Sequence, residues 1–170
     1  MSLDDDLLAL AGHREDAYQS SLAQMVLDHP GTLRRQLRHY LAEQSNRGRL
    51  KKTYDHVPQL KTHSGNIQEL VCEEVEFKSD AKLDFNIELE QQQTGWFVKR
   101  FKFDLRLSGR VIAMVRIHLN QERGRDALKV PRCHLHLGQS EAHIPFPIMS
   151  PRLVVHLICE HLEPDIGKTL

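Results

Sequence analysis

Hydrophobic and polar residues alternate along the second half of the chain, between residues 83 and 137. In each run the odd-numbered positions are apolar and the even-numbered ones mostly polar, and turns that contain Gly separate the runs. A period of two is typical of β-strands with one buried face, so the runs predict an antiparallel meander of four to five strands. The predicted apolar positions are Leu83, Phe85, Ile87, Leu89, Phe97, Phe101, Phe103, Leu105, Leu107, Val111, Ala113, Val115, Ile117, Leu119, Leu135 and Leu137.

The same alternation restricts the hairpins. Residues paired across a ladder point to the same face, and in every run that face holds either the odd-numbered or the even-numbered residues. The numbers of two paired residues must therefore sum to an even value. For "LSGRV" this favours Leu107 opposite Val111 around a three-residue loop. The opposite face is then expected to be polar and basic, with semi-exposed side chains: Arg100, Lys102, Arg106, Arg116, Arg132, His134 and His136.

Apolar residues at helical spacing precede the alternating runs. Residues 16–28 have a helical pattern that "DHPG" ends, because Pro30 cannot continue a helix. Thr32 is the expected N-cap of the next helix. Its apolar face falls at i, i+4, i+7 and i+8, occupied by Leu33, Leu37, Tyr40 and Leu41. Residues 44–66 have little periodicity and are predicted to be a linker or an ordered long loop.

A third helical pattern closes the chain. Ser150 is its expected N-cap, and Pro151 fits the first helical position, where its missing N–H has no partner to lose. Its apolar stripe consists of Leu153, Val154, Leu157, Ile158 and Leu162. The fold class is therefore α+β: N-terminal helices, the meander, and a C-terminal helix packed on the apolar sheet face. The expected division is a helical region over residues 1–60 and a sheet-plus-helix domain over residues 61–170.

Composition and short motifs restrict the ligands and the cellular location that we expect for the protein. Lys plus Arg equals Asp plus Glu at 23 each, so net charge gives no case for nucleic acid. No apolar run approaches the roughly 20 residues that span a bilayer, and "MSLDDDLLAL" lacks the basic start of a secretory leader. The expectation is a cytoplasmic protein without membrane contact. No cofactor is expected, since no Gly-rich phosphate loop, HExxH or CxxC occurs.

Two histidines carry the main chemical hypothesis. His134 and His136 are two apart on one predicted strand, so both rings leave the same face. Such a pair suits acid–base catalysis near neutral pH, and we assign both as candidate catalytic residues. Metal binding would need a third ligand such as His143, His118 or Asp104, and a merely polar strand face is the other alternative. Cys133 has the opposite parity and is expected in the core.

Basic residues form two further groups. Arg116, His118 and Arg132 share the predicted face of the histidine pair, and Arg34, Arg35 and Arg38 share one face of the first predicted helix. These six are the candidate binding residues, because such groups suit phosphate contact. Acidic residues cluster instead in "CEEVEFKSDAKLDFNIELE". Segregated charge on a neutral chain favours docking to a protein partner or self-association as much as nucleic acid.

The segment "HLHLGQSEAHIPFPIMSPRLVVHLICEHL" resembles the C-terminal pattern of the TumE-type toxin proteins of bacterial toxin–antitoxin loci. The shared features are an HxH followed by Gly138, a short loop with Pro145 and Phe146, and a closing amphipathic helix. The resemblance covers roughly residues 83–163. It implies a bacterial conflict system, either toxin–antitoxin or phage defence, and a protein partner such as a helix-turn-helix antitoxin. The helix–meander–helix order also suits a ubiquitin-conjugating-like fold, but no cysteine has the context for that activity.

Two functions follow as hypotheses. The first is a toxin-like or phage-defence effector that acts on RNA or DNA through a basic sheet face bearing His134 and His136. The second is a non-catalytic protein-binding subunit of a larger defence or regulatory complex, which the split charge layout favours. A homo-oligomer is compatible with either.

Overall fold

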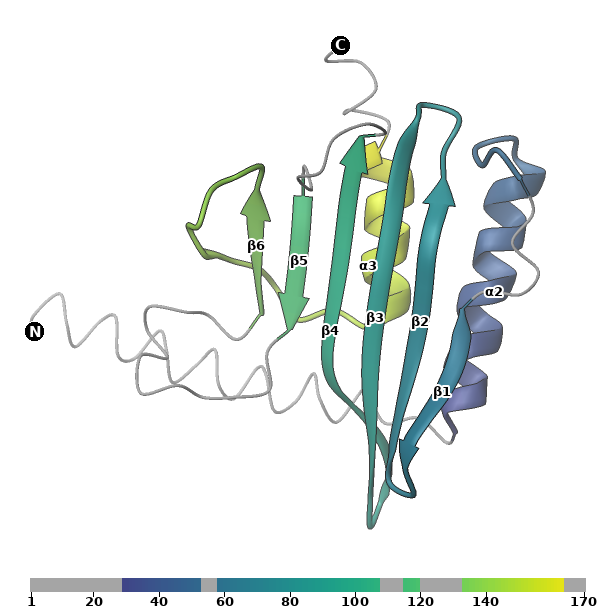
Figure 1. Cartoon of the computed structure of the whole chain (residues 1–170), viewed down its shortest axis with the longest axis vertical. Coiled ribbons are helices and arrows are strands. Elements are labelled where there is room, and N and C mark those ends of the chain that lie inside the picture. The colour runs from purple at the N-terminus through teal and green to yellow at the C-terminus, as the bar shows by residue number, and fades with distance from the viewer. Residues whose placement is uncertain (1–28, 53–57, 108–114, 120–132, 164–170) are drawn as a thin grey trace, which may run out of the picture.

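The computed structural model describes residues 29–52, 58–107, 115–119 and 133–163. Within them, seven antiparallel strands form one sheet in which spatial order follows chain order (Figure 1). The strands are β1 (Gln59–Ser64), β2 (Ile67–Glu76), β3 (Ala81–Gln92), β4 (Gly95–Leu107), β5 (Val115–Leu119), β6 (Cys133–Leu137) and β7 (Ile144–Pro145). The α+β class and the meander are confirmed, but the prediction of four to five strands was too low.

The additional strands lack a clean period of two. β1 is an edge strand in which all residues but Leu60 are exposed, so it has no buried face to mark it within the predicted loop. In β2 a bulge lies between Cys72 and Val75, and Glu74 adopts a positive φ of 55° there. Buried positions are therefore even-numbered before the bulge and odd-numbered after it, which obscures a strand pattern.

A second bulge corrects the predicted faces of β4. Glu88 pairs with Arg100 and Leu89 pairs with Val98, so Lys99 is the extra residue. The extra residue reverses the alternation on its N-terminal side. Trp96 and Val98 are consequently buried at 6% and 3% exposure, whereas Phe97, predicted to be on the apolar face, is only half-buried.

The β4–β5 register keeps the predicted parity but differs from the register that the predicted hairpin implies. Leu105 pairs with Val115 and Phe103 with Ile117, so the paired numbers sum to an even value. The proposed Leu107–Val111 pair would have placed Ala113 opposite Leu105, two residues away from the observed partner. Val111 itself lies outside the described residues.

Two helical elements lie on the sheet's apolar face. α2 (Pro30–Asn46) runs beside β1 and β2, and α3 (Pro151–Leu157) lies behind β3 and β4 (Figure 1). α3 continues as the π-helical turn η1 (Ile158–Leu162). The N-cap of α2 is His29, whose Nδ1 accepts from Gly31 N at 3.0 Å, so the expected start at Thr32 was wrong. The Ser150 cap and Pro151 start of α3 are confirmed.

One hydrophobic core joins the helices to the sheet. Leu37 and Leu41 of α2 and Val154 of α3 are buried in the same cluster as Phe103 and Ile117. The division at residue 60 stays a prediction, although α2 and the sheet bury these side chains together. No helix in the described ranges is long and apolar enough to cross a bilayer. The predicted helix over residues 16–28 lies outside those ranges.

Candidate functional site

The strand pair β5–β6 brings the chemically interesting histidines together. In its register His118 lies directly opposite His134, and Arg116 lies opposite His136. Cross-strand partners share a face, and so do residues two apart on one strand. The three rings therefore meet on the polar side of the sheet, with centroids 5.4 Å apart for His118–His134, 5.3 Å for His118–His136 and 4.9 Å for His134–His136.

A fourth histidine completes the group. His143 precedes β7, which pairs with β6 through His134–Pro145 and Leu135–Ile144. This pairing sets the His143 ring against two others, at centroid distances of 4.7 Å from His134 and 4.6 Å from His136. We call His118, His134, His136 and His143 the histidine cluster.

The two strand histidines are more buried than expected. His134 is 1% exposed and His136 is 6% exposed, whereas the sequence predicted semi-exposed side chains. The error has a local cause, because β7 pairs with β6 and brings the His143 ring against the rings of His134 and His136. β7 has only two residues, too few to give a periodic signal.

Asp104 of β4 adjoins the histidine cluster. Its Oδ1 lies 3.8 Å from His118 Nε2, beyond hydrogen-bond range, and its Oδ2 pairs with Lys102 Nζ at 2.7 Å. Both Oδ1 and Nε2 are buried without a hydrogen-bond partner in the described part of the chain. Burial alone would raise the pKa of Asp104, but the neighbouring imidazole and ammonium outweigh it and hold that pKa below its usual range.

Arg116 and His136 share a carbonyl. Arg116 donates to Gly138 O at 3.5 Å and Ser140 O at 3.3 Å, and His136 Nδ1 lies 3.3 Å from Ser140 O. A carbonyl only accepts, so Nδ1 carries the proton in this contact and Nε2 keeps its lone pair. Burial, aided by the Arg116 charge, lowers the pKa of His136, which favours the neutral ring at pH 7.

This arrangement allows two kinds of chemistry. Neutral and protonated imidazoles side by side can exchange protons with a substrate. One donor atom from each of His118, His134 and His136 also lies within 4.8 Å of the others, close enough to consider a shared metal ion. Cys133 takes no part: it is buried as predicted, and burial raises the pKa of its thiol to about 12.

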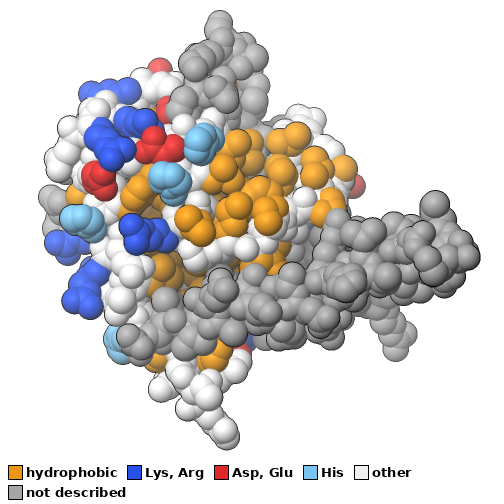
Figure 2. Space-filling model, turned by 180° about the vertical axis from the view of Figure 1, so that it is seen from behind, with side chains coloured by type: hydrophobic (Ala, Val, Ile, Leu, Met, Phe, Trp, Pro, Cys, Tyr) orange, Lys and Arg blue, Asp and Glu red, His pale blue; other side chains and the backbone are white. Residues whose placement is uncertain are grey.

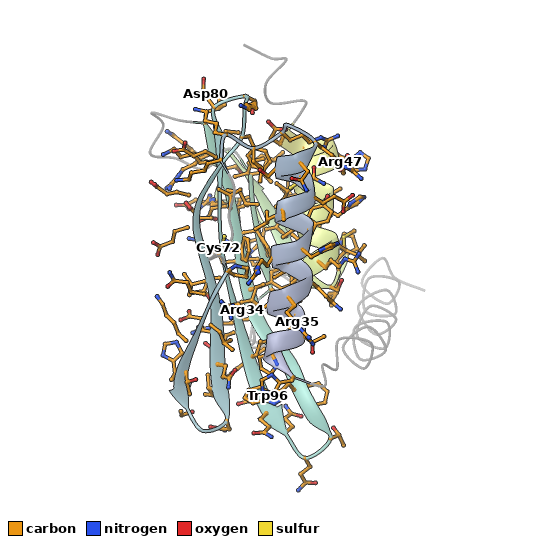
Figure 3. The ribbon with its side chains drawn as sticks, turned by 90° about the vertical axis from the view of Figure 1, so that its right-hand side faces the viewer. Arg34, Arg35, Arg47, Cys72, Asp80 and Trp96 are labelled. Carbon is orange, nitrogen blue, oxygen red and sulfur yellow. The ribbon has the colours of Figure 1, made fainter. Side chains whose placement is uncertain are left out.

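The six predicted binding residues separate in space. Arg116 and His118 are at the histidine cluster, and Arg132 lies outside the described residues. Arg34 and Arg35 lie on α2, at the other edge of the sheet from β6, and so does Arg38 (Figures 1 and 3).

The α2 arginines have separate surroundings. Arg34 Nε donates to Pro58 O at 2.9 Å and so supports the chain that enters β1. Arg35 lines a groove of about 240 Å³ between α2 and α3, together with His39 and Arg152. Neither residue contributes to the histidine cluster.

The polar sheet face is charge-compensated rather than basic. Among its cations, Lys99 and Arg100 both pair with Glu88, Lys102 pairs with Asp104, and Arg106 pairs with Asp84. Sequence alternation places Arg100, Lys102 and Arg106 on this face but does not reveal the acids that pair with them. Arg116 differs from these four, since its described partners are carbonyl groups.

No family model, curated protein or solved structure matches this chain. The resemblance to TumE-type toxins therefore stays a prediction.

Proposed function

We propose that the protein is a toxin-like or phage-defence effector that acts on RNA or DNA at the histidine cluster. The observation that carries this proposal is the meeting of four imidazoles with the Arg116 guanidinium at the β5–β6 pair. Imidazoles titrate near neutral pH, and a guanidinium is the side chain best suited to a phosphate.

Phosphodiester cleavage in RNA would use these groups as follows. A neutral ring removes the proton of the 2′-hydroxyl, whose oxygen attacks phosphorus. A protonated ring gives its proton to the 5′-oxygen as the P–O5′ bond breaks. His134 and His136, with ring centroids 4.9 Å apart, are the candidates for these two roles. Arg116, opposite His136, is the candidate for contact with the charged phosphate oxygens.

The charge layout restricts how a nucleic acid would bind. Because the cations of β4 are paired with acids, they are poorly placed to neutralise a long stretch of phosphate backbone. The proposal is therefore a local contact with one or two phosphates near Arg116, and the salt dependence of binding should be shallow.

A double substitution tests the proposal. Purified wild-type protein and the His134→Ala/His136→Ala variant are incubated with labelled single- and double-stranded RNA and DNA, and growth is scored on induced expression in bacteria. The expected result is loss of cleavage and of growth inhibition in the double variant alone. His39→Ala is the matched control, because it removes an exposed histidine on α2 far from the histidine cluster. Cleavage and growth inhibition that survive the double substitution would contradict the proposal.

A second candidate function is that of a non-catalytic protein-binding subunit. It is favoured by large exposed apolar side chains, at 52% for Leu137 of β6, 39% for Ile144 of β7 and 55% for Leu153 of α3. Figure 2, a view from behind, shows hydrophobic side chains gathered over the middle of that face, with Lys and Arg to one side. Contiguous exposed apolar surface is typical of interaction sites. A monomer in light scattering, with no partner on co-purification, would count against this function and against a homo-oligomer.

A further inference from the structure

Three of the clustered histidines have the positions of a metal-ligand set. His134 and His136 project from the same side of β6, and His118 faces them from the neighbouring strand. We propose that His118, His134 and His136 bind one zinc ion and leave its fourth coordination position open. This inference rests on the proposed function only for what the ion does, and binding of the ion can be tested by itself.

The separations are compatible with coordination after small side-chain rotations. The three donor atoms lie within 4.8 Å of one another. Zinc with Zn–N bonds of about 2.0–2.1 Å and tetrahedral angles needs donors about 3.4 Å apart. The ring nitrogens of this group must therefore close by at most about 1.4 Å, which rotation about the broad χ2 torsion of histidine allows without moving the strands.

Neighbouring acceptors orient two of the rings. The Nε2 side of His118 faces the Asp104 carboxylate at 3.8 Å, which leaves Nδ1 as its metal donor. The Nδ1 side of His136 faces Ser140 O at 3.3 Å, which leaves Nε2. A histidine ligand commonly donates its other ring N–H to a carboxylate or carbonyl. His118 Nε2 and Asp104 Oδ1 are also buried without hydrogen bonds among the described residues, an arrangement that a bound ion would resolve by drawing them together.

The donor chemistry selects the kind of metal. Imidazole nitrogen suits zinc and other late transition metals, whereas magnesium and calcium need oxygen ligands. The nearby carboxylate and guanidinium set the local charge. Asp104 lies directly opposite Arg116 across the β4–β5 pair and forms its ion pair with Lys102. With three neutral protein ligands the ion keeps a water, the arrangement of catalytic rather than structural zinc sites.

The open position defines a substrate class. Arg116 lies opposite His136 and His143 packs on the His136 ring, so a group bound beside His136 meets a guanidinium and a further imidazole. This environment suits an anionic oxygen such as that of a phosphodiester. There the ion would activate water as the nucleophile, in place of the acid–base roles proposed above for His134 and His136, because a ring bound to the ion cannot also exchange a proton with the substrate.

Metal binding is measured on the full chain. Protein freed of metal with a chelator is titrated with zinc alone, and zinc retained after dialysis is counted by mass spectrometry. The expected result is one zinc ion per chain. Cobalt(II) should replace zinc and give the intense visible absorption of four-coordinate geometry. This cobalt spectrum needs no variant, so it remains informative if a substituted chain folds poorly.

Variants assign the ligands. His136→Ala should weaken zinc binding at least about 100-fold, and the positioning variant Asp104→Asn by about 10- to 100-fold. The surface control His39→Ala should leave zinc binding within about threefold of wild type. His143→Ala removes a ring that packs on His134 and His136 and should weaken zinc binding less than His136→Ala does. Circular dichroism checks that each variant is folded.

The outcomes distinguish the metal site, its open position, the proposed function and the role of the ion. Zinc below one ion per ten chains, or six-coordinate cobalt absorption, would overturn the metal site. Equal losses in His143→Ala and His136→Ala would overturn the open fourth position. One bound zinc ion without cleavage of RNA or DNA would support the site and refute the proposed function instead. Cleavage by metal-free protein would uphold the function and overturn the role given to the ion.

Discussion

Glu160 joins the two helical elements behind the sheet. Its carboxylate receives Arg49 Nη2 at 2.8 Å, Gln44 Nε2 at 3.1 Å and Arg47 Nη1 at 3.2 Å. Gln44 is fully buried, and the Glu160 side chain is 18% exposed. The perturbation is Glu160→Gln, which keeps the shape of the side chain and removes its charge.

The contacts set the size of the effect. The Arg49 pair, partly shielded from water, is worth about 1 kcal/mol, and disturbing the Gln44 bond costs about 1 kcal/mol because a buried amide loses a charged partner. Arg47 is 51% exposed and also pairs with Glu43, so its share is a few tenths of a kcal/mol. The variant should therefore lose about 2 kcal/mol of unfolding free energy at pH 7, or about 4–8 °C in Tm for a chain of this size.

The pH dependence gives an independent check. Burial alone would raise the pKa of Glu160, but the Gln44 hydrogen bond and the charges of Arg49 and Arg47 outweigh it and hold that pKa below its usual range. A carboxylate with a lowered folded-state pKa contributes stability above its unfolded pKa and loses it as pH falls through the folded value. The difference between wild type and Glu160→Gln should thus shrink below about pH 4.3.

Urea unfolding followed by circular dichroism at pH 7 and at steps down to pH 3 measures both effects. Glu43→Gln is the matched control, since Glu43 is 44% exposed and makes an i,i+4 pair with Arg47. It should cost about 0.5 kcal/mol or less. A Glu160→Gln variant as stable at pH 7 as Glu43→Gln, or a stability difference from wild type that grows on acidification, would contradict this role of the Glu160 carboxylate.

Two further predictions concern the core and the thiols. Phe103→Ala should cost about 3–5 kcal/mol in urea unfolding because this side chain is fully buried, whereas Leu137→Ala, at a position 52% exposed, should cost under about 0.5 kcal/mol. Cys72, Cys133 and Cys159 are buried with thiol pKa values raised to about 12. Native protein at pH 8 should leave a thiol-specific dye unreacted, and urea-unfolded protein should react at all three; rapid reaction of any native thiol would contradict its burial.

The sequence predicted the sheet where the alternation was uninterrupted. Between Ala81 and Glu88, and again over β5, every second residue is apolar and buried, so the strands and their faces could be read directly. The bulge at Lys99 shifts the strand pairing by one residue and so moves Trp96 and Val98 to the buried face. The bulge does not alter the amino-acid composition of the strand, so the pattern of apolar and polar residues does not reveal it. Glu74 gives no signal either, because positive φ usually favours Gly or Asn.

Part of the candidate site could be predicted from the sequence, because the alternation is also uninterrupted over β5 and β6. The period of two placed His134 and His136 on one face, and it placed His118 on the polar face of β5. The contact of His143 with both rings follows instead from β7, whose two residues pair with β6 across an irregular loop. The burial of the histidines depends on that contact, so a strand-by-strand interpretation could not find it.

The distribution of ion pairs explains why the histidine cluster is the chemically distinctive part of the polar face. On β3 and β4 acids and bases neutralise each other, as in the pair of Arg106 with Asp84, and paired groups have little capacity left for a ligand. On β5 and β6 the opposed residues are His118 with His134 and Arg116 with His136, and neither strand supplies an acid. Burial and the charge of Arg116 lower the pKa of His136 and so favour its neutral ring. A neutral imidazole acts as a ligand or a base rather than as a member of a salt-bridge network. We therefore expect the proposed chemistry at the β5–β6 pair, where the described partners of Arg116 are carbonyl groups rather than an acid.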